Sequence, residues 1–91
     1  MQTIHKYQLT DTEVVLQIGQ RTRAGVDLLS AGLDPVGALC VWARVDTTMP
    51  LTSVKFQVIG TGQDTASTLN ATFLGTVLAG SYVWHVFYRA L

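Results

Sequence analysis

The chain has 91 residues, with six acidic and six basic side chains and therefore a formal net charge of zero. This neutrality excludes the basic surface on which binding to duplex DNA or to an anionic membrane depends. Charged residues make up 13% of the chain, against about 25% in an average soluble domain. We therefore expect a single domain, residues 1–91, whose apolar surface is partly covered by another copy of the chain, unless Thr, Ser and Gln side chains supply the polar coat.

Two segments near the amino terminus alternate between apolar and polar side chains. Residues 3–9 and 13–19 each show this period of two, which predicts a pair of β-strands. Thr10-Asp11-Thr12 between them is typical of a turn. We therefore expect these two strands to pair as a hairpin.

The next segment is less regular. Residues 24–31 fit either a strand or a single helical turn, and Gly25 favours the strand because glycine weakens a helix. The stretch 32–37 contains Pro35 between two glycines, which predicts a turn. This turn should join the segment directly to a strand over residues 39–46 as a hairpin.

Residues 39–46 and 54–59 predict two adjacent strands joined by a short polar connection, and we expect the rest of the chain to pack against them. One face of each strand is apolar and should face the core. The opposite face carries Trp42, Arg44 and Lys55. An aromatic ring can stack on a base and an arginine can pair with a phosphate, so this face suits recognition. Alternatively, Trp42 and Arg44 form a cation–π pair that stabilises the sheet.

The second half of the chain predicts a loop and two further strands. Residues 60–68 are poor in apolar side chains and begin with Gly60-Thr61-Gly62. Successive N–H groups of such a segment can converge on a phosphate, although many Gly-x-Gly segments merely turn the chain. Residues 69–78 predict a strand in which Gly75 marks a bulge. Residues 82–88 carry bulky side chains on both faces, which indicates a central strand or one covered by a partner.

Seven short strands without a helical period predict an all-β fold, a compact antiparallel β-sandwich or barrel. Cys40 is the only cysteine, so no intramolecular disulfide forms, and we expect a buried thiol. His5 and His85 lie at no spacing typical of a metal site, and we expect His85 to be packed and hydrogen-bonded. Because no catalytic motif accompanies them, the sequence predicts a protein that is not an enzyme and needs no cofactor.

Five segments resemble a known family: Ile4–Tyr7, Leu39–Asp46, Phe56–Gly62, Phe73–Thr76 and Val83–Phe87. In order and spacing they are similar to a family of small phage and prophage domains of unknown function, with the pattern Trp-Ala-x-Val-Asp, Gly-Thr-Gly and His-Val-Phe. The resemblance implies a phage origin and a β fold, and it brings no known reaction or site residues. The family pattern commonly has His after Gly-Thr-Gly, where this chain has Gln63.

These observations lead to a first hypothesis, a phage counter-defence protein that sequesters a small nucleotide immune signal as a homo-oligomer. No secretory signal follows Met1 and no run approaches about 18 apolar residues, so we expect the host bacterial cytoplasm. The candidate ligand-binding residues are Trp42, Arg44, Lys55, Gly60, Thr61, Gly62 and Gln63.

The alternative hypothesis is a protein–protein interaction module, either an inhibitor of a host defence protein or a small virion component. Tyr82, Trp84 and Tyr88 would be its exposed interface residues, because aromatic side chains are typical anchors of interface centres. Single-stranded nucleic acid is a lesser option, since six acidic residues balance the six basic ones.

Overall fold

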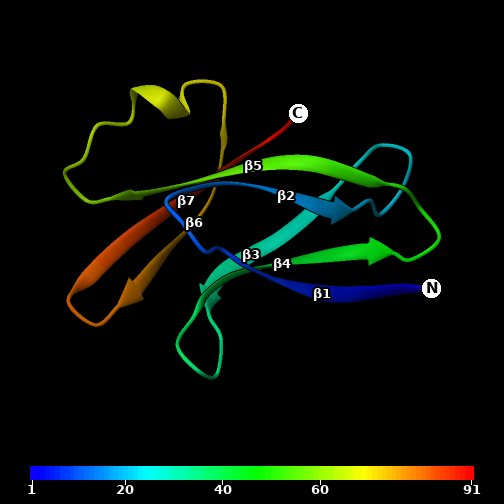
Figure 1. Cartoon of the computed structure of the whole chain (residues 1–91), viewed down its shortest axis with the longest axis horizontal. Helices are drawn as coiled ribbons and strands as arrows, with labels where there is room; N and C mark the ends of the chain where they lie inside the picture. Colours follow the sequence, from blue (N-terminus) through cyan, green and yellow to red (C-terminus); the bar gives the residue numbers. More distant parts are fainter.

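The computed structural model describes all 91 residues, which form two antiparallel sheets (Figure 1). The three-stranded sheet has the order β1 (Gln2–Gln8), β4 (Leu39–Asp46), β3 (Asp27–Leu33). The four-stranded sheet has the order β2 (Glu13–Gly19), β5 (Leu51–Gly60), β7 (Tyr82–Ala90), β6 (Thr72–Ala79). The one helical element, η1 (Ala66–Thr68), is a three-residue turn, so the chain has no helix that could cross a bilayer. The predicted all-β sandwich is confirmed.

The predicted hairpin of the first two strands is wrong. β1 pairs with β4, from Gln2 opposite Asp46 to Gln8 opposite Cys40, whereas β2 pairs with β5. The segment between β1 and β2 therefore crosses from one sheet to the other. Because β4 and β5 are more buried than β1 and β2, they take central positions, and β1 and β2 flank them as edges.

The predicted side-by-side arrangement of β4 and β5 is also wrong. β4 and β5 lie in different sheets, so they face each other across the interior instead of lying side by side. Both apolar faces were predicted correctly, since Val41 and Ala43 of β4 and Val54 and Phe56 of β5 are fully buried. Alternation along a strand shows which side chains point inward, but it carries no information on which strand lies alongside.

Three other predicted features are confirmed. β3 and β4 form a hairpin with Leu33 opposite Leu39, and β7 is a central strand between β5 and β6. The ladder of β6 and β7 shifts register between Phe73 and Gly75, as the predicted bulge requires. At the bulge β6 lies against β3, because a Cβ built on Gly75 would be 4.0 Å from Cβ of Ala31. These contacts close one side of the sandwich.

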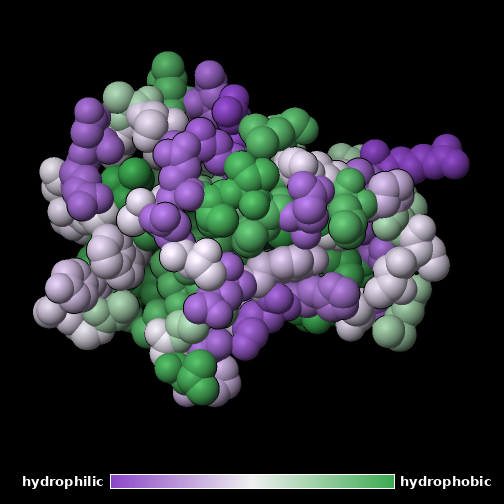
Figure 2. All heavy atoms as spheres, viewed as in Figure 1, coloured by the Kyte–Doolittle hydropathy of each residue, from purple (hydrophilic) through white to green (hydrophobic).

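The core lies between the two sheets and is small, with fourteen residues of the chain buried. Ten of them form one hydrophobic cluster: Leu9, Ile18, Val41, Ala43, Val45, Val54, Phe56, Val58, Val77 and Val86. Many large apolar side chains remain at the surface. Figure 2 shows hydrophobic atoms reaching the surface in the middle of this face, with hydrophilic residues around them.

Cys40 lies on the outer side of β4, yet it is fully buried, so the predicted buried thiol is confirmed. Burial raises the pKa of the Cys40 thiol, and the neighbouring carboxylate of Asp34 raises it further. The thiolate is therefore disfavoured at neutral pH, and Cys40 has the character of a packing residue and not of a nucleophile.

Asp34 fastens the turn between β3 and β4 to the neighbouring strand β1. One carboxylate oxygen accepts hydrogen bonds from the N–H groups of Val36 at 3.0 Å and Ala38 at 2.9 Å, and the other lies 2.9 Å from Nζ of Lys6. The hydrogen bond from Lys6, with those from the backbone, holds the pKa of Asp34 below its usual value. The same pair raises the pKa of Lys6.

We expect the protein to lose stability as the pH falls below about 4. Because the folded-state pKa of Asp34 is lowered, its carboxylate stabilises the native state above the unfolded pKa, and this contribution disappears as the pH falls through the folded pKa. Asp46 adds to the effect, since the Thr48 hydroxyl lowers its pKa. Melting temperatures measured in steps from neutral to acidic pH should therefore fall, and should fall less in Asp34→Asn. An equal acid loss in that variant would contradict the role of Asp34.

Candidate binding site

Trp42 and Arg44 project from the outer face of the three-stranded sheet, where neither lines a hollow. Nε of Arg44 lies 3.0 Å from Oδ2 of Asp27, and Nη1 of Arg21 lies 3.1 Å from the same oxygen. The Trp42 ring packs over β3, since a Cβ built on Gly32 would be 3.5 Å from its Cζ3. The indole covers the sheet and the guanidinium is paired. Both side chains thus have structural partners within the chain.

Lys55 is separated from this pair by the whole thickness of the sandwich. It points outward from β5, which belongs to the four-stranded sheet, and its ammonium forms an ion pair with Glu13 of β2. The structure therefore does not bring Trp42, Arg44 and Lys55 together as one surface. The prediction depended on β4 and β5 being neighbours, and that pairing does not occur.

The Gly60–Gln63 segment forms a tight turn whose N–H groups are mostly used within the chain. Gln63 N–H donates to the Gly60 carbonyl at 3.0 Å, and Gly62 has a φ of 88°, which glycine adopts without strain. Gly60 N–H donates to Oε1 of Gln63 at 2.8 Å, and Thr61 N–H donates to the carbonyl of Val83 at 3.3 Å. A phosphate held by this turn would have to displace these bonds, so the expected cradle is not preformed.

His85 connects this turn to the outer face of the four-stranded sheet. Its Nε2 lies 2.8 Å from Oγ1 of Thr61, and its Nδ1 lies 2.9 Å from Oγ1 of Thr76. The expected hydrogen bonding of His85 is confirmed, but the ring is half-buried outside the core. One ring nitrogen donates and the other accepts in a neutral imidazole, so two hydroxyl groups satisfy both. The network fixes the turn against β6 and β7.

The neighbour of the turn is Trp84 and not Trp42. Trp84 lies opposite Gly60 in the β5–β7 ladder, and a Cβ built on Gly60 would be 3.3 Å from Cζ3 of Trp84. Tyr82 stacks on the indole with ring centroids 5.5 Å apart and planes inclined by 11°. Glycine at position 60 allows this close approach of the indole to the backbone. From the sequence, Gly60 was predicted as a ligand-binding residue and Trp84 as an interface residue, so their contact was not expected.

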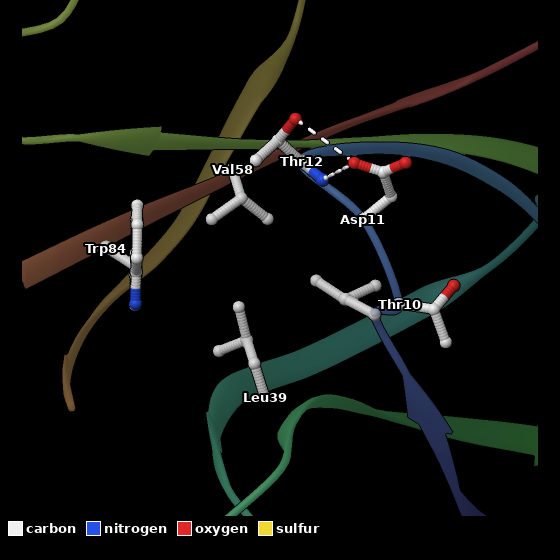
Figure 3. A pocket seen from close by; sticks show the side chains of 7 residues that line it. Thr10, Asp11, Thr12, Leu39, Val58 and Trp84 are labelled. Atoms are coloured by element: carbon white, nitrogen blue, oxygen red, sulfur yellow. Dashed lines mark hydrogen bonds between the residues drawn. The ribbon is translucent and has the colours of Figure 1, made fainter. Parts of the chain in front are cut away.

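Trp84 forms a wall of two hollows at this end of the sandwich. The first hollow has a volume of about 220 Å³ and lies between the sheets (Figure 3). The second hollow has a volume of about 280 Å³ and lies beside the turn. The first is lined by Leu9, Thr10, Asp11, Thr12, Leu39, Val58 and Trp84. The second is lined by Gly60, Thr61, Gln63, Ser81, Tyr82, Val83 and Trp84.

Neither hollow contains a basic side chain. Asp11 is the only acidic or basic group of the first hollow, and its Oδ1 accepts a hydrogen bond from Thr12 N–H at 2.7 Å, as Figure 3 shows. The second hollow has no carboxylate and no cationic side chain. This end of the molecule therefore suits an apolar or cationic group better than a phosphate.

The three predicted interface residues differ in exposure. Tyr82 is 63% exposed, as predicted. Trp84 was predicted to be exposed as well, but it is half-buried, packs against the core and lines both hollows. The prediction is wrong for Tyr88, which packs against the core with its ring centroid 6.4 Å from that of Phe56. Trp84, Val86 and Tyr88 share the inward face of β7, a spacing of two that could have shown this from the sequence.

Apart from Trp84, the residues of the first hollow were not predicted as site residues. These residues come from parts of the chain that meet only after folding: Leu9 from the connection between β1 and β2, Leu39 from β4 and Val58 from β5. Nowhere in the chain do three or more His, Cys, Asp or Glu side chains converge as metal ligands would.

No curated protein and no solved structure matches this chain. A family model described as "Domain of unknown function (DUF7352)" matches residues 1–91, and the chain therefore belongs to that family.

Proposed function

We propose that the protein binds another protein through the end of the sandwich that carries Tyr82 and Trp84, without catalysing a reaction. The observation that carries this proposal is the exposed ring of Tyr82, stacked on the half-buried indole of Trp84 and bordered by hollows without basic groups. Exposed aromatic side chains beside concave apolar surface are typical of the centre of a protein interface. The partner would insert an apolar side chain into the first hollow and place a basic side chain near Asp11.

The phage origin and the site of action are part of the same proposal. The resemblance to small phage and prophage domains supports a protein that acts in the bacterial cytoplasm as an inhibitor of a host defence protein. The low content of charged residues and the exposed apolar side chains support self-association. A small virion component would use the same aromatic end against another virion protein.

Sequestration of a small nucleotide is the second candidate function. One observation favours it: the Tyr82 ring and the Trp84 indole border the second hollow together with Thr61, so a base could stack there. The ion pairs of Arg44 and Lys55 and the internal bonds of the turn disfavour it, because few groups remain for the phosphates. Protein binding is therefore the better supported of the two.

The test compares Tyr82→Ala with Phe73→Ala. Both variants remove an exposed aromatic ring from the four-stranded sheet, but Phe73 is 53% exposed and lies away from both hollows. In a pull-down from host lysate, the wild type and Phe73→Ala should retain one stoichiometric host protein. Tyr82→Ala should weaken binding of that protein about 30-fold, the effect of an interface hot spot of about 2 kcal/mol.

Three other outcomes are informative. An unchanged nucleotide, released when the purified protein is denatured, would support the second candidate instead. A cleaved nucleotide would indicate an enzyme and contradict both candidates. Retention of the same host protein by Tyr82→Ala at wild-type affinity would show that the aromatic end is not the interface.

A further inference from the structure

The sandwich has four edge strands: β3 and β6 are protected by bulges and by each other, and β2 is attached to the other sheet at one end. β3 carries a bulge between Leu28 and Ser30, β6 carries the bulge at Gly75, and these two edges pack against each other. The end of β2 is attached to the other sheet, because Gly19 N–H donates to the Tyr7 hydroxyl at 3.3 Å and the Gln20 carbonyl accepts from Asp46 N–H at 2.9 Å. Bulges and cover of this kind prevent edge-to-edge pairing.

The edge of β1 lacks every such protection. Its seven residues pair with β4 in continuous register, without a bulge and without proline. Its one charged side chain, Lys6, is neutralised by Asp34. Figure 1 shows β1 along the margin of the sheet, from the amino terminus inward, with no strand beyond it. A bulge-free edge whose single charge is already paired within the chain is a template for another strand.

The hydrogen-bond phase of β1 shows which backbone groups are free. Leu9 N–H donates to the Leu39 carbonyl, and Thr47 N–H donates to the Met1 carbonyl. Because bonded pairs of an antiparallel ladder fall on alternate residues, the odd-numbered residues of β1 are the ones bonded to β4. The N–H and C=O groups of the even-numbered residues therefore point to the open edge. These residues are Gln2, Ile4, Lys6 and Gln8.

We infer that β1 pairs antiparallel with β1 of a second copy, about a two-fold axis at His5, to form one continuous six-stranded sheet. This register overlaps the two strands completely, so every free N–H and C=O of the edge has a partner. It places Ile4 opposite Lys6 and Gln2 opposite Gln8. An axis at Lys6 would instead put two ammonium groups opposite each other, and an axis at Ile4 would leave Gln8 unpaired.

The features of β1 favour a second copy of this chain as the partner that pairs with its open edge. A row of alternating donors and acceptors is complementary to an extended backbone, and the register about His5 makes β1 complementary to itself. The pairing would also cover Ile4, which is 58% exposed. This inference specifies the self-association proposed above and leaves the end with Tyr82 and Trp84 free for a partner.

The test uses Ile4→Pro and Ile4→Thr. Proline removes an N–H that β4 does not use, so the edge loses a donor while the sheet within the subunit keeps its bonds. In sedimentation over a concentration series, the wild type and Ile4→Thr should form a dimer of 9.9 kDa chains. Ile4→Pro should remain at 9.9 kDa with an unchanged circular dichroism spectrum.

Amide hydrogen exchange of the wild type provides a readout that does not depend on how Ile4→Pro folds. Protection of the Ile4 and Lys6 amides should rise with protein concentration, while that of His5 should not change. A wild type that stays monomeric would overturn both the edge pairing and the proposed self-association. A dimer that persists in Ile4→Pro, or exchange of Ile4 and Lys6 that is independent of concentration, would overturn the edge pairing alone.

Discussion

Phe56→Ala should lower the free energy of unfolding by about 3–5 kcal/mol, the typical cost of removing a buried phenylalanine. Phe56 is the largest of the fully buried side chains and lies on β5, at the centre of the hydrophobic cluster. Its ring also packs against that of Tyr88. The neighbouring strands are held by continuous ladders and can collapse only partly into the cavity. Urea denaturation of the wild type and of Phe56→Ala would measure the difference in the free energy of unfolding.

Phe73→Ala is the matched control for this prediction. Phe73 contacts Phe87 edge to face, with centroids 5.4 Å apart, but it is half-exposed on the outer face of the sheet. Its removal should cost no more than about 1.5 kcal/mol, the value of an aromatic pair at the surface. Because a domain of this size is stable by only about 5–15 kcal/mol, the two variants should be clearly separated. Equal losses would mean that Phe56 is not the centre of the core.

Much of the fold could be predicted from the period of two along the chain. Alternation located the seven strands and the inward faces of β4 and β5, and Pro35 between glycines located the β3–β4 turn. The neighbours of the strands could not be found in this way. A side chain that points inward is satisfied by any opposing sheet, so the same pattern is compatible with β4 and β5 lying side by side or facing each other.

The candidate site was harder to predict because it depends on those neighbours. Once β5 pairs with β7, Gly60 lies opposite Trp84. Part of the set assigned to a ligand (Gly60, Thr61 and Gln63) then lines one hollow with part of the set assigned to an interface (Tyr82 and Trp84). The sequence also gives no sign that Asp27 would pair with Arg44. Both basic groups that suggested phosphate recognition, Arg44 and Lys55, are paired with carboxylates within the fold. Only the local turn chemistry of Gly62 could be anticipated.

Gly19→Ala should destabilise the protein by about 1–3 kcal/mol through overpacking. Gly19 is buried at the end of β2, where this strand meets β4 of the opposite sheet. A Cβ there would be 3.1 Å from both Cβ and Cγ1 of Val45, which is 1% exposed and has no free space to enter. To remove this overlap the two sheets must separate locally, and the hydrogen bond from Gly19 N–H to the Tyr7 hydroxyl opposes that separation. Thermal unfolding should show a melting temperature lower by about 4–8 °C per kcal/mol.

Gly32→Ala separates this clash from the general effect of replacing a glycine in a strand. A Cβ on Gly32 would be 3.5 Å from the Trp42 ring, an ordinary contact, and the backbone there needs no positive φ. Its unfolded chain becomes less flexible, so this variant should gain about 0.4–1 kcal/mol. A loss of stability in Gly19→Ala together with a gain in Gly32→Ala would show that close contact of the sheets at Val45 requires glycine at position 19. A stabilised Gly19→Ala would mean that β2 and β4 can move apart at little cost, and that this end of the sandwich is not tightly closed.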